Sequence, residues 1–228
     1  MQKEQGLEEI RNVLILNTSS LSDVGLYGGK MGVSIFLAHS ARYSNQEVYL
    51  DLVHYLIKEI FEDLDNSFSS NFEIGLSGIG WGVNYLLCHH FLSGDVNDVL
   101  FDLDQNLMRY DVRRINDFDF DRGLGGLVYY VNSRLMIQQG DQRPFDSLFL
   151  SDLLYVIKNN YNAWHNLSVK DVFFQYIDFL SDKPMKDCIC SLPDFLKGKE
   201  IKITDSIYRM SLGLKNGLAG YGLNLMNI

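Results

Sequence analysis

A glycine-rich block that occurs twice near the N-terminus constrains the fold most. Residues 75–87 read GLSGIGWGVNYLL, and residues 25–37 read GLYGGKMGVSIFL. At an offset of 50 residues the two blocks share six identities in 13 aligned positions. Agreement at one fixed offset indicates an internal repeat, and a period of about fifty residues fits a stacked helical hairpin.

Two further glycine blocks extend the repeat along the chain. The third block is Gly123-Leu124-Gly125-Gly126, and its Gly-Leu-x-Gly lies 48 residues after the one at Gly75. The fourth block, residues 217–223, lies 94 residues after the third, which is two periods of 47. We therefore expect a copy without glycines between them, at residues 169–181.

The segments that precede the glycine blocks have the spacing of amphipathic helices. The clearest is 46–65, in which Val48, Leu52, Leu56 and Ile60 step by four while acidic residues and Lys58 occupy the other face. Similar patterns predict helices over 7–17, 96–113 and 145–161. Residues 169–181 are expected to form the helix that follows 145–161, without the glycines, and residues 185–196 a shorter helix. The helices that the glycine blocks open are apolar nearly all round, as buried helices are.

These patterns predict an all-α fold of about five helical hairpins, each with an amphipathic and an apolar helix. The simplest arrangement is a single α/α toroid domain over residues 1–228, whose inner helices start with Gly-x-x-Gly turns. An open α-solenoid is the alternative, although both helices of its hairpins are usually two-faced.

Glycine at four helix starts needs a local reason, because it costs roughly 1 kcal/mol against alanine inside a helix. One reason is packing, since glycine lets another backbone approach closely. The other is ligand contact, since the unpaired N–H groups of helix N-termini in the mouth of a ring would favour an anion.

Composition excludes several classes of partner. The 228 residues carry a net charge of −9 with no basic stripe, which disfavours nucleic acid and anionic membrane surfaces. No run of 18 apolar residues and no signal-peptide pattern is seen, so membrane insertion is not expected. Three cysteines indicate free thiols in a reducing compartment, which predicts a cytoplasmic protein.

The glycine blocks resemble those of the lanthionine synthetase C-like family. Residues 75–82 (GLSGIGWG) look like the early repeats of that family, and residues 214–222 (LKNGLAGYG) look like a late one. The resemblance implies an α/α toroid. It also implies a zinc ion, held by two cysteines and a histidine, that activates a peptide cysteine for addition to a dehydrated serine or threonine.

The sequence departs from the family at the zinc ligands. The Trp-Cys-Tyr-Gly turn of the cyclases is absent, and Lys215-Asn216-Gly217 stands where their Cys-His-Gly precedes a late Gly-x-x-Gly. Lysine and asparagine do not replace a thiolate and an imidazole. We therefore expect no metal and no cofactor, and catalytic residues are unassigned. The chain also has about five hairpins where the family toroid has seven.

Other metal ligands could be assembled only from scattered residues. Cys88-His89-His90 are adjacent on a helix and diverge by about 100° each, whereas helical metal ligands favour i, i+3 or i+4 spacing, so packing and helix-end roles are expected for them. Cys188 and Cys190 with His165 are the one route to a site of two cysteines and a histidine.

The acidic loop from Asp117 to Asp121 stands before the third glycine block. Paired carboxylates there could act as acid and base, as in carbohydrate-active α/α toroids. The alternative is a solvated loop that caps the helix after Gly123.

The sequence thus favours a zinc-free binding or accessory module in peptide modification, not an enzyme. A precursor or leader peptide, or a partner protein, would be held at the toroid mouth. The alternatives are enzymes: a zinc-dependent peptide cyclase with relocated ligands, or a carbohydrate-active toroid that uses the Asp117–Asp121 loop. The residues expected at the mouth flank the four glycine turns and are Tyr27, Lys30, Trp81, Asp119, Asp121, Arg122, Lys215 and Asn216.

Overall fold

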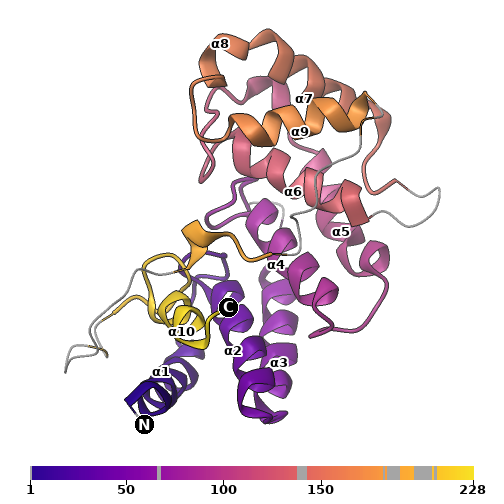
Figure 1. The fold of residues 1–228 in the computed structure, drawn as a ribbon. Helices are drawn as coiled ribbons and strands as arrows, with labels where there is room; N and C mark the ends of the chain where they lie inside the picture. The colour runs from indigo at the N-terminus through magenta and orange to yellow at the C-terminus, as the bar shows by residue number, and fades with distance from the viewer. Residues whose placement is uncertain are drawn as a thin grey trace. The chain divides into compact units, whose positions relative to one another are not determined.

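The computed structural model describes residues 2–65, 68–137, 143–181, 183, 191–197, 207 and 210–228 (Figure 1). The chain groups into two compact units. Unit 1 takes the described residues of 1–65, 85–93 and 190–228, and unit 2 those of 66–84 and 94–189. Whether 1–228 forms a single toroid domain stays a prediction.

All regular structure in the described residues is helical, which confirms the all-α class. Unit 1 contains α1 (Gln2–Thr18), α2 (Lys30–Ser44), α3 (Val48–Asp63), the 3-10 turn η2 (Asp194–Leu196) and α10 (Leu218–Met226). Helix α4 (Leu76–Cys88) runs from unit 2 into unit 1. Unit 2 contains α5 (Val96–Met108), the 3-10 turn η1 (Val112–Arg114), α6 (Leu124–Ile137), α7 (Ser147–Asn159), α8 (Tyr161–Trp164) and α9 (Lys170–Leu180).

Burial separates the two kinds of helix that the sequence predicts. Twelve of the 15 residues of α2 and 11 of the 14 residues of α6 are buried, whereas α3 and α5 bury four residues each. The helices opened by glycine blocks are therefore interior, and the amphipathic ones cover them.

The expected copy without glycines corresponds to α9. This helix packs against α6, but its described buried residues are only Phe173 and Tyr176, so it is two-faced. In the predicted helix 185–196, the described part contains only the η2 turn, while residues 185–190 lie outside the described residues.

One backbone hydrogen bond recurs at all four glycine blocks. The first N–H group of each glycine-opened helix donates to the carbonyl oxygen seven residues earlier, at 2.8 Å in every copy. The loop before each helix therefore turns back onto the helix start. The donor and acceptor pairs are Lys30 and Asp23, Leu76 and Ser69, Leu124 and Asp117, and Leu218 and Ser211.

This bond corrects the register of the repeat. The glycines directly before the four helices, which we term the cap glycines, are Gly29, Gly75, Gly123 and Gly217. The counterpart of Gly75 is thus Gly29 and not Gly25, and the first offset is 46 residues rather than 50. Residues 25–32 contain two consecutive Gly-x-x-Gly patterns, 25–28 and 29–32, and the loop that precedes the helix decides between them.

The cap glycines are required by close backbone approach. A Cβ atom at Gly29 would lie 2.5 Å from the carbonyl oxygen of Asp23, and one at Gly123 would lie 2.6 Å from that of Asp117. Packing is therefore sufficient reason for these glycines. The first N–H group of each of these helices is not available to an anion, because it donates to the returning loop.

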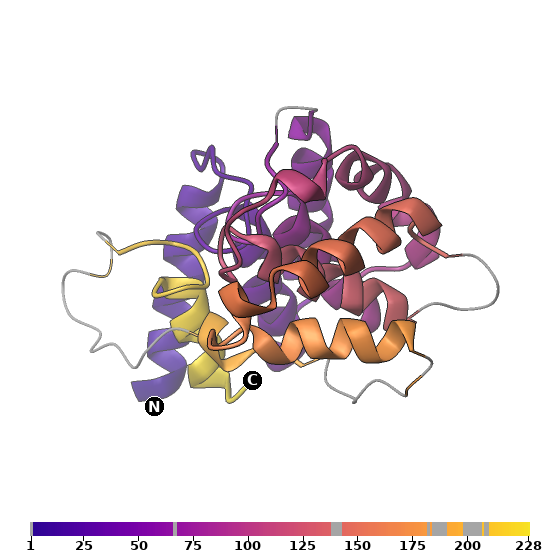
Figure 2. The ribbon, with the colours of Figure 1, turned by 90° about the horizontal axis from the view of Figure 1, so that it is seen from above.

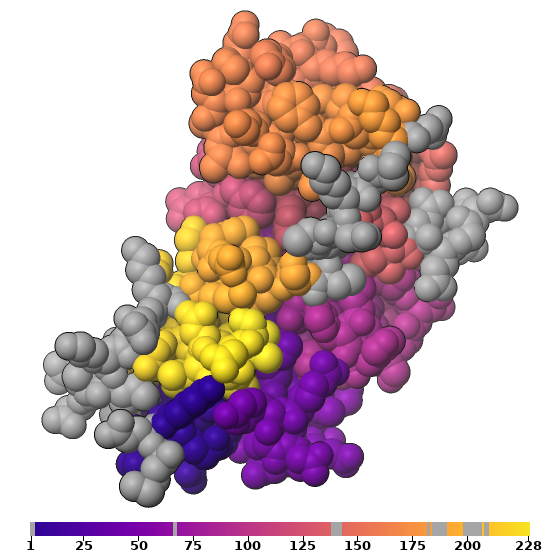
Figure 3. Space-filling model, viewed as in Figure 1, coloured from indigo at the N-terminus to yellow at the C-terminus, as the bar shows by residue number. Residues whose placement is uncertain are grey.

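Neighbouring copies are joined by a second recurring bond, two positions before the cap glycine. In unit 2 the N–H group of Glu73 donates to the carbonyl oxygen of Asp121 at 2.9 Å, which links copy two to copy three. In unit 1 the N–H group of Lys215 donates to Tyr27 at 3.2 Å, which links the last glycine block to the first. Helix α10 packs on α1 and α2 (Figure 2), and the yellow C-terminal residues lie against indigo N-terminal ones in Figure 3.

Candidate functional site

The eight residues predicted at the mouth fall into two groups, one in each unit. Unit 1 holds Tyr27, Lys30, Lys215 and Asn216, and unit 2 holds Trp81, Asp119, Asp121 and Arg122. In unit 1 the residues come from the first and last glycine blocks, and in unit 2 they come from the second and third.

The unit 1 group is built around Tyr27, whose side chain is only 4% exposed. The Lys215 ammonium lies 4.4 Å from the centre of the Tyr27 ring, a cation–π contact between the last block and the first. Asn216 is exposed and has a left-handed backbone with φ 58°. Its backbone ends the returning loop just before Gly217.

Lys30 is the first residue of α2, and its side chain is buried. Its ammonium pairs with Glu59 at 3.0 Å and lies 3.8 Å from Asp63, both at the C-terminal end of α3. The charge of Lys30 is therefore directed to the covering helix.

In unit 2, Trp81 belongs to an aromatic cluster between copies two and three. Its ring centre lies 5.8 Å from that of Phe72 and 6.2 Å from that of Tyr129, and Phe120 packs on both partners. Trp81 is fully buried, whereas Phe120 and Tyr129 are partly exposed. Trp81 thus supports the surface that Phe120 and Tyr129 present.

The acidic loop caps α6, as the solvated-loop interpretation expects, because the carbonyl oxygens of Asp117 and Asp119 accept from the N–H groups of Leu124 and Gly125. The Asp119 carboxylate accepts hydrogen bonds from the N–H groups of Arg122 (2.8 Å) and Gly123 (3.1 Å). Burial would raise the pKa of Asp119, but these hydrogen bonds outweigh it and lower the pKa. A carboxyl group that stays ionised is poorly suited to donate a proton as a general acid.

Arg122 lies at the rim of the same loop. Its Nε donates to the Glu73 carboxylate at 2.6 Å, so the ion pair joins copies two and three beside the Glu73–Asp121 backbone bond. The Arg122 side chain remains 71% exposed. Asp121 is half-buried, which leaves Asp119 and Arg122 as the most accessible predicted residues of this unit.

A family model described as lanthionine synthetase C-like protein matches residues 20–171 of the chain. The match spans the first three glycine blocks and the start of α9. The chain belongs to the lanthionine synthetase C-like family. No curated protein sequence matches the chain.

The residues before the cap glycines lack the ligand types that hold the zinc ion in the lanthionine synthetase C-like cyclases. The two positions before the cap glycine hold Tyr27-Gly28, Glu73-Ile74, Asp121-Arg122 and Lys215-Asn216. No copy offers a thiolate or an imidazole there, so these turns do not fit the family's zinc ion.

The other potential metal ligands do not assemble into a metal site among the described residues. No group of three His, Cys, Asp or Glu side chains among the described residues could hold a metal ion. In the Cys88-His89-His90 segment, His90 has a left-handed backbone just after the end of α4. The His89 ring packs at a tilt against the Tyr85 ring, with ring centres 4.2 Å apart. Cys188 and Cys190 lie outside the described residues.

Sequence reasoning missed the buried polar contacts of the interior helices. In unit 2, three consecutive residues of α6 bind three different helices. Asn132 donates to Val172 of α9, Ser133 accepts from Asn84 of α4, and Arg134 pairs with Asp104 of α5 at 2.9 Å. These partners are far apart in sequence, so no local pattern reveals them.

No helix in the described part of the chain is long and apolar enough to cross a membrane.

Proposed function

We propose that this lanthionine synthetase C-like protein binds a peptide at the cap-glycine ends of its interior helices, without zinc and without catalysing cyclisation. The main observation behind the proposal is the Lys215-Asn216 turn. These residues stand where the family's cyclases place a cysteine and a histidine, and the Lys215 ammonium is engaged with the Tyr27 ring.

The two bonds between neighbouring copies support a closed α/α toroid for this binding site. Glu73 donates to Asp121, and Lys215 donates to Tyr27, at the same position relative to the cap glycine. In a ring the last copy meets the first through the contacts that join consecutive copies. The order of donors and acceptors agrees, because copy two donates to copy three and the last donates to the first.

The accessible residues at the cap-glycine ends would contact the peptide. In unit 2, Asp119 and Arg122 are exposed and Asp121 is half-buried. In unit 1, Asn216 is exposed and Lys215 is half-buried. The buried Tyr27, Lys30 and Trp81 would hold the loops in place. The family relationship supports a peptide as the ligand, and we place the module in the cytoplasm as a single domain over residues 1–228.

The enzyme alternatives have less support. A zinc-dependent cyclase would need relocated ligands such as Cys188 and Cys190. A carbohydrate-active enzyme would need a proton donor in the Asp117–Asp121 loop, where Asp119 is held ionised.

Panning a random 12-residue peptide library against the full chain tests the proposal. Selected peptides should bind the Arg122→Glu and Lys215→Glu variants at least about tenfold more weakly than the unaltered protein, because a charge at the site is reversed. Lys58→Glu is the control, since Lys58 is 74% exposed on α3. Selection of no peptide, or equal binding to all variants, would contradict the proposal.

A further inference from the structure

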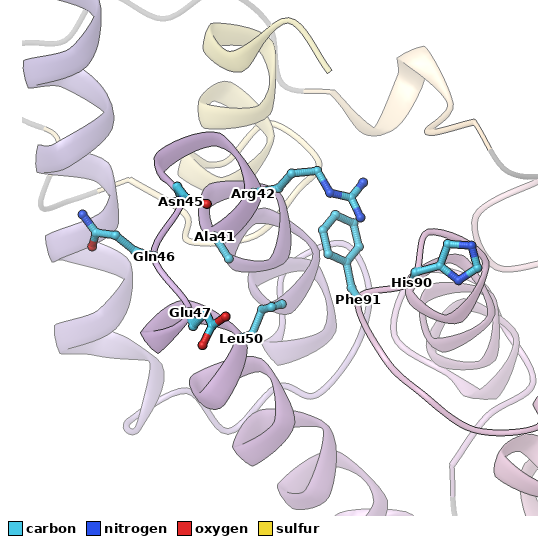
Figure 4. A pocket seen from close by; sticks show the side chains of 8 residues that line it. All are labelled: Ala41, Arg42, Asn45, Gln46, Glu47, Leu50, His90 and Phe91. Carbon is cyan, nitrogen blue, oxygen red and sulfur yellow. The ribbon is translucent and has the colours of Figure 1, made fainter.

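A hollow lies in unit 1 at the C-terminal end of α2, the end opposite Gly29. The end of α2, the start of α3 and the segment after α4 line it (Figure 4). Its volume is about 210 Å³, which is below the roughly 300–1,000 Å³ of pockets for drug-sized ligands. A space of this size suits one amino-acid side chain.

The floor of the hollow is apolar and fixed. Ala41 and Phe91 are each 4% exposed, and Leu50 is half-buried. The Phe91 ring packs edge-on against His39, with ring centres 4.9 Å apart. The floor is therefore preformed.

Arg42 is held in place at the edge of this floor. Its guanidinium lies 4.0 Å from the centre of the Phe91 ring, and its Nη2 donates to the carbonyl oxygen of His89 at 2.6 Å. A guanidinium has five N–H donors, so most of them remain for another acceptor. Stacking on a ring orients the planar group, which lowers the entropy cost of binding a carboxylate.

Arg42 has no carboxylate partner among the described residues, although the chain carries 29 acidic residues. Five other arginines do have one, namely Arg11, Arg113, Arg114, Arg122 and Arg134. Glu47 lines the same hollow and likewise forms no ion pair within the described part of the chain. Figure 4 shows Arg42 on the Phe91 side and Glu47 beside Leu50.

We propose that this hollow binds a peptide segment in which an apolar residue precedes an acidic one. The apolar side chain would occupy the floor, and the carboxylate would accept hydrogen bonds from Arg42. Glu47, together with the amides of Asn45 and Gln46, would pair with the peptide backbone. An opposite charge on each side of the hollow favours a peptide over a fatty acid, which has no donor for Glu47. The site is separate from the cap-glycine end.

The probe is the peptide acetyl-Gly-Leu-Glu-Gly-amide, titrated into the ¹⁵N-labelled full chain and followed by NMR. The backbone amide signals of residues 41–50 and 90–91 should shift. The matched peptide with Gln in place of Glu should bind at least about tenfold more weakly, because it lacks the charge-assisted hydrogen bond.

Two variants distinguish recognition from folding. Arg42→Lys keeps the charge but loses the planar fork, and it should weaken binding of the Glu peptide several-fold while the remaining spectrum is unchanged. Arg114→Lys, on an exposed side chain of unit 2, should leave binding unchanged. Equal binding of the Glu and Gln peptides, or the absence of any shift, would overturn the inference. Shifts confined to residues 119–122 and 215–216 would overturn it too and would support the cap-glycine site alone.

Discussion

The N–H group of Lys215 donates to the carbonyl oxygen of Tyr27 at 3.2 Å, although the two residues belong to the last and first glycine blocks. The bond occupies the position that Glu73 and Asp121 occupy between copies two and three. The repeat is therefore expressed in contacts between copies as well as within each copy. The Tyr27 ring also receives the Lys215 ammonium, so the turn that lacks the zinc ligands has a structural role.

Replacing a cap glycine should destabilise the fold. In Gly29→Ala the added Cβ atom would lie 2.5 Å from two backbone atoms, the Asp23 oxygen and the Gly25 nitrogen. We expect the free energy of unfolding to fall by roughly 1–3 kcal/mol in urea titrations, the usual cost of overpacking. The control is Gly28→Ala, whose Cβ would meet only the Asp23 carboxylate oxygen at 3.2 Å. An equal effect of both changes would refute close backbone approach as the reason for Gly29.

The buried pair of Asp104 and Arg134 should show strong coupling. Both nitrogens of Arg134 that contact Asp104 lie within 3.0 Å of one oxygen, and Tyr130 donates to the other at 2.5 Å. Arg134→Leu should cost about 3–5 kcal/mol in unfolding free energy, because it leaves a buried carboxylate without its partner. The double variant with Asp104→Leu should regain much of this loss.

The exposed pair of Asp111 and Arg113 is the comparison for the double-mutant cycle of Asp104 and Arg134. Its coupling energy should be at most about 1 kcal/mol. Burial raises the pKa of Asp104 to about 6, while the charge of the Arg134 guanidinium acts to lower it. The carboxyl group is therefore ionised at pH 7. Similar coupling energies for the buried and exposed pairs would contradict this account.

The stability of unit 1 should depend on pH through His39. Burial, with His89 and Arg42 nearby, lowers the pKa of His39 from 6.5 to about 3, and its Nε2 lies 2.7 Å from the Tyr85 hydroxyl. The unfolded chain therefore takes up the proton first as pH falls below about 6.5. Stability that is fully present above pH 6.5 is lost toward pH 3, by about 2 kcal/mol between pH 7 and 5.

Urea unfolding of His39→Gln at the two pH values measures this contribution. The variant should lose about 2 kcal/mol less than the unaltered protein on going from pH 7 to 5. His54→Gln, which changes an exposed histidine of α3, should behave as the unaltered protein does. An unchanged pH dependence in His39→Gln would show that the ring is not kept neutral in the fold.

Local patterns in the sequence predicted the helices well. The steps of four in 46–65 located α3, and the returning glycine blocks located α2, α4, α6 and α10. The register of the first copy was wrong, because Gly25, Gly28, Gly29 and Gly32 satisfy the Gly-x-x-Gly pattern twice. The hydrogen bond from Lys30 to Asp23 distinguishes the two.

Contacts between residues far apart in the chain could not be predicted from the sequence. Asp104 and Arg134 are 30 residues apart, and Arg42 reaches His89 across 47. Neither pair has a periodic signal, because each depends on how two helices pack. The same holds for the buried state of Trp81, since its glycine-rich surroundings are equally compatible with an exposed turn.

The zinc content of the purified full chain tests the central claim most directly. The protein would be incubated with a twofold excess of zinc, dialysed, and analysed by inductively coupled plasma mass spectrometry. A lanthionine synthetase C-like protein with Lys215-Asn216 at the ligand turn should retain far less than one zinc ion per chain. One zinc ion per chain that is lost in a Cys188→Ala, Cys190→Ala variant would contradict the account and establish relocated ligands.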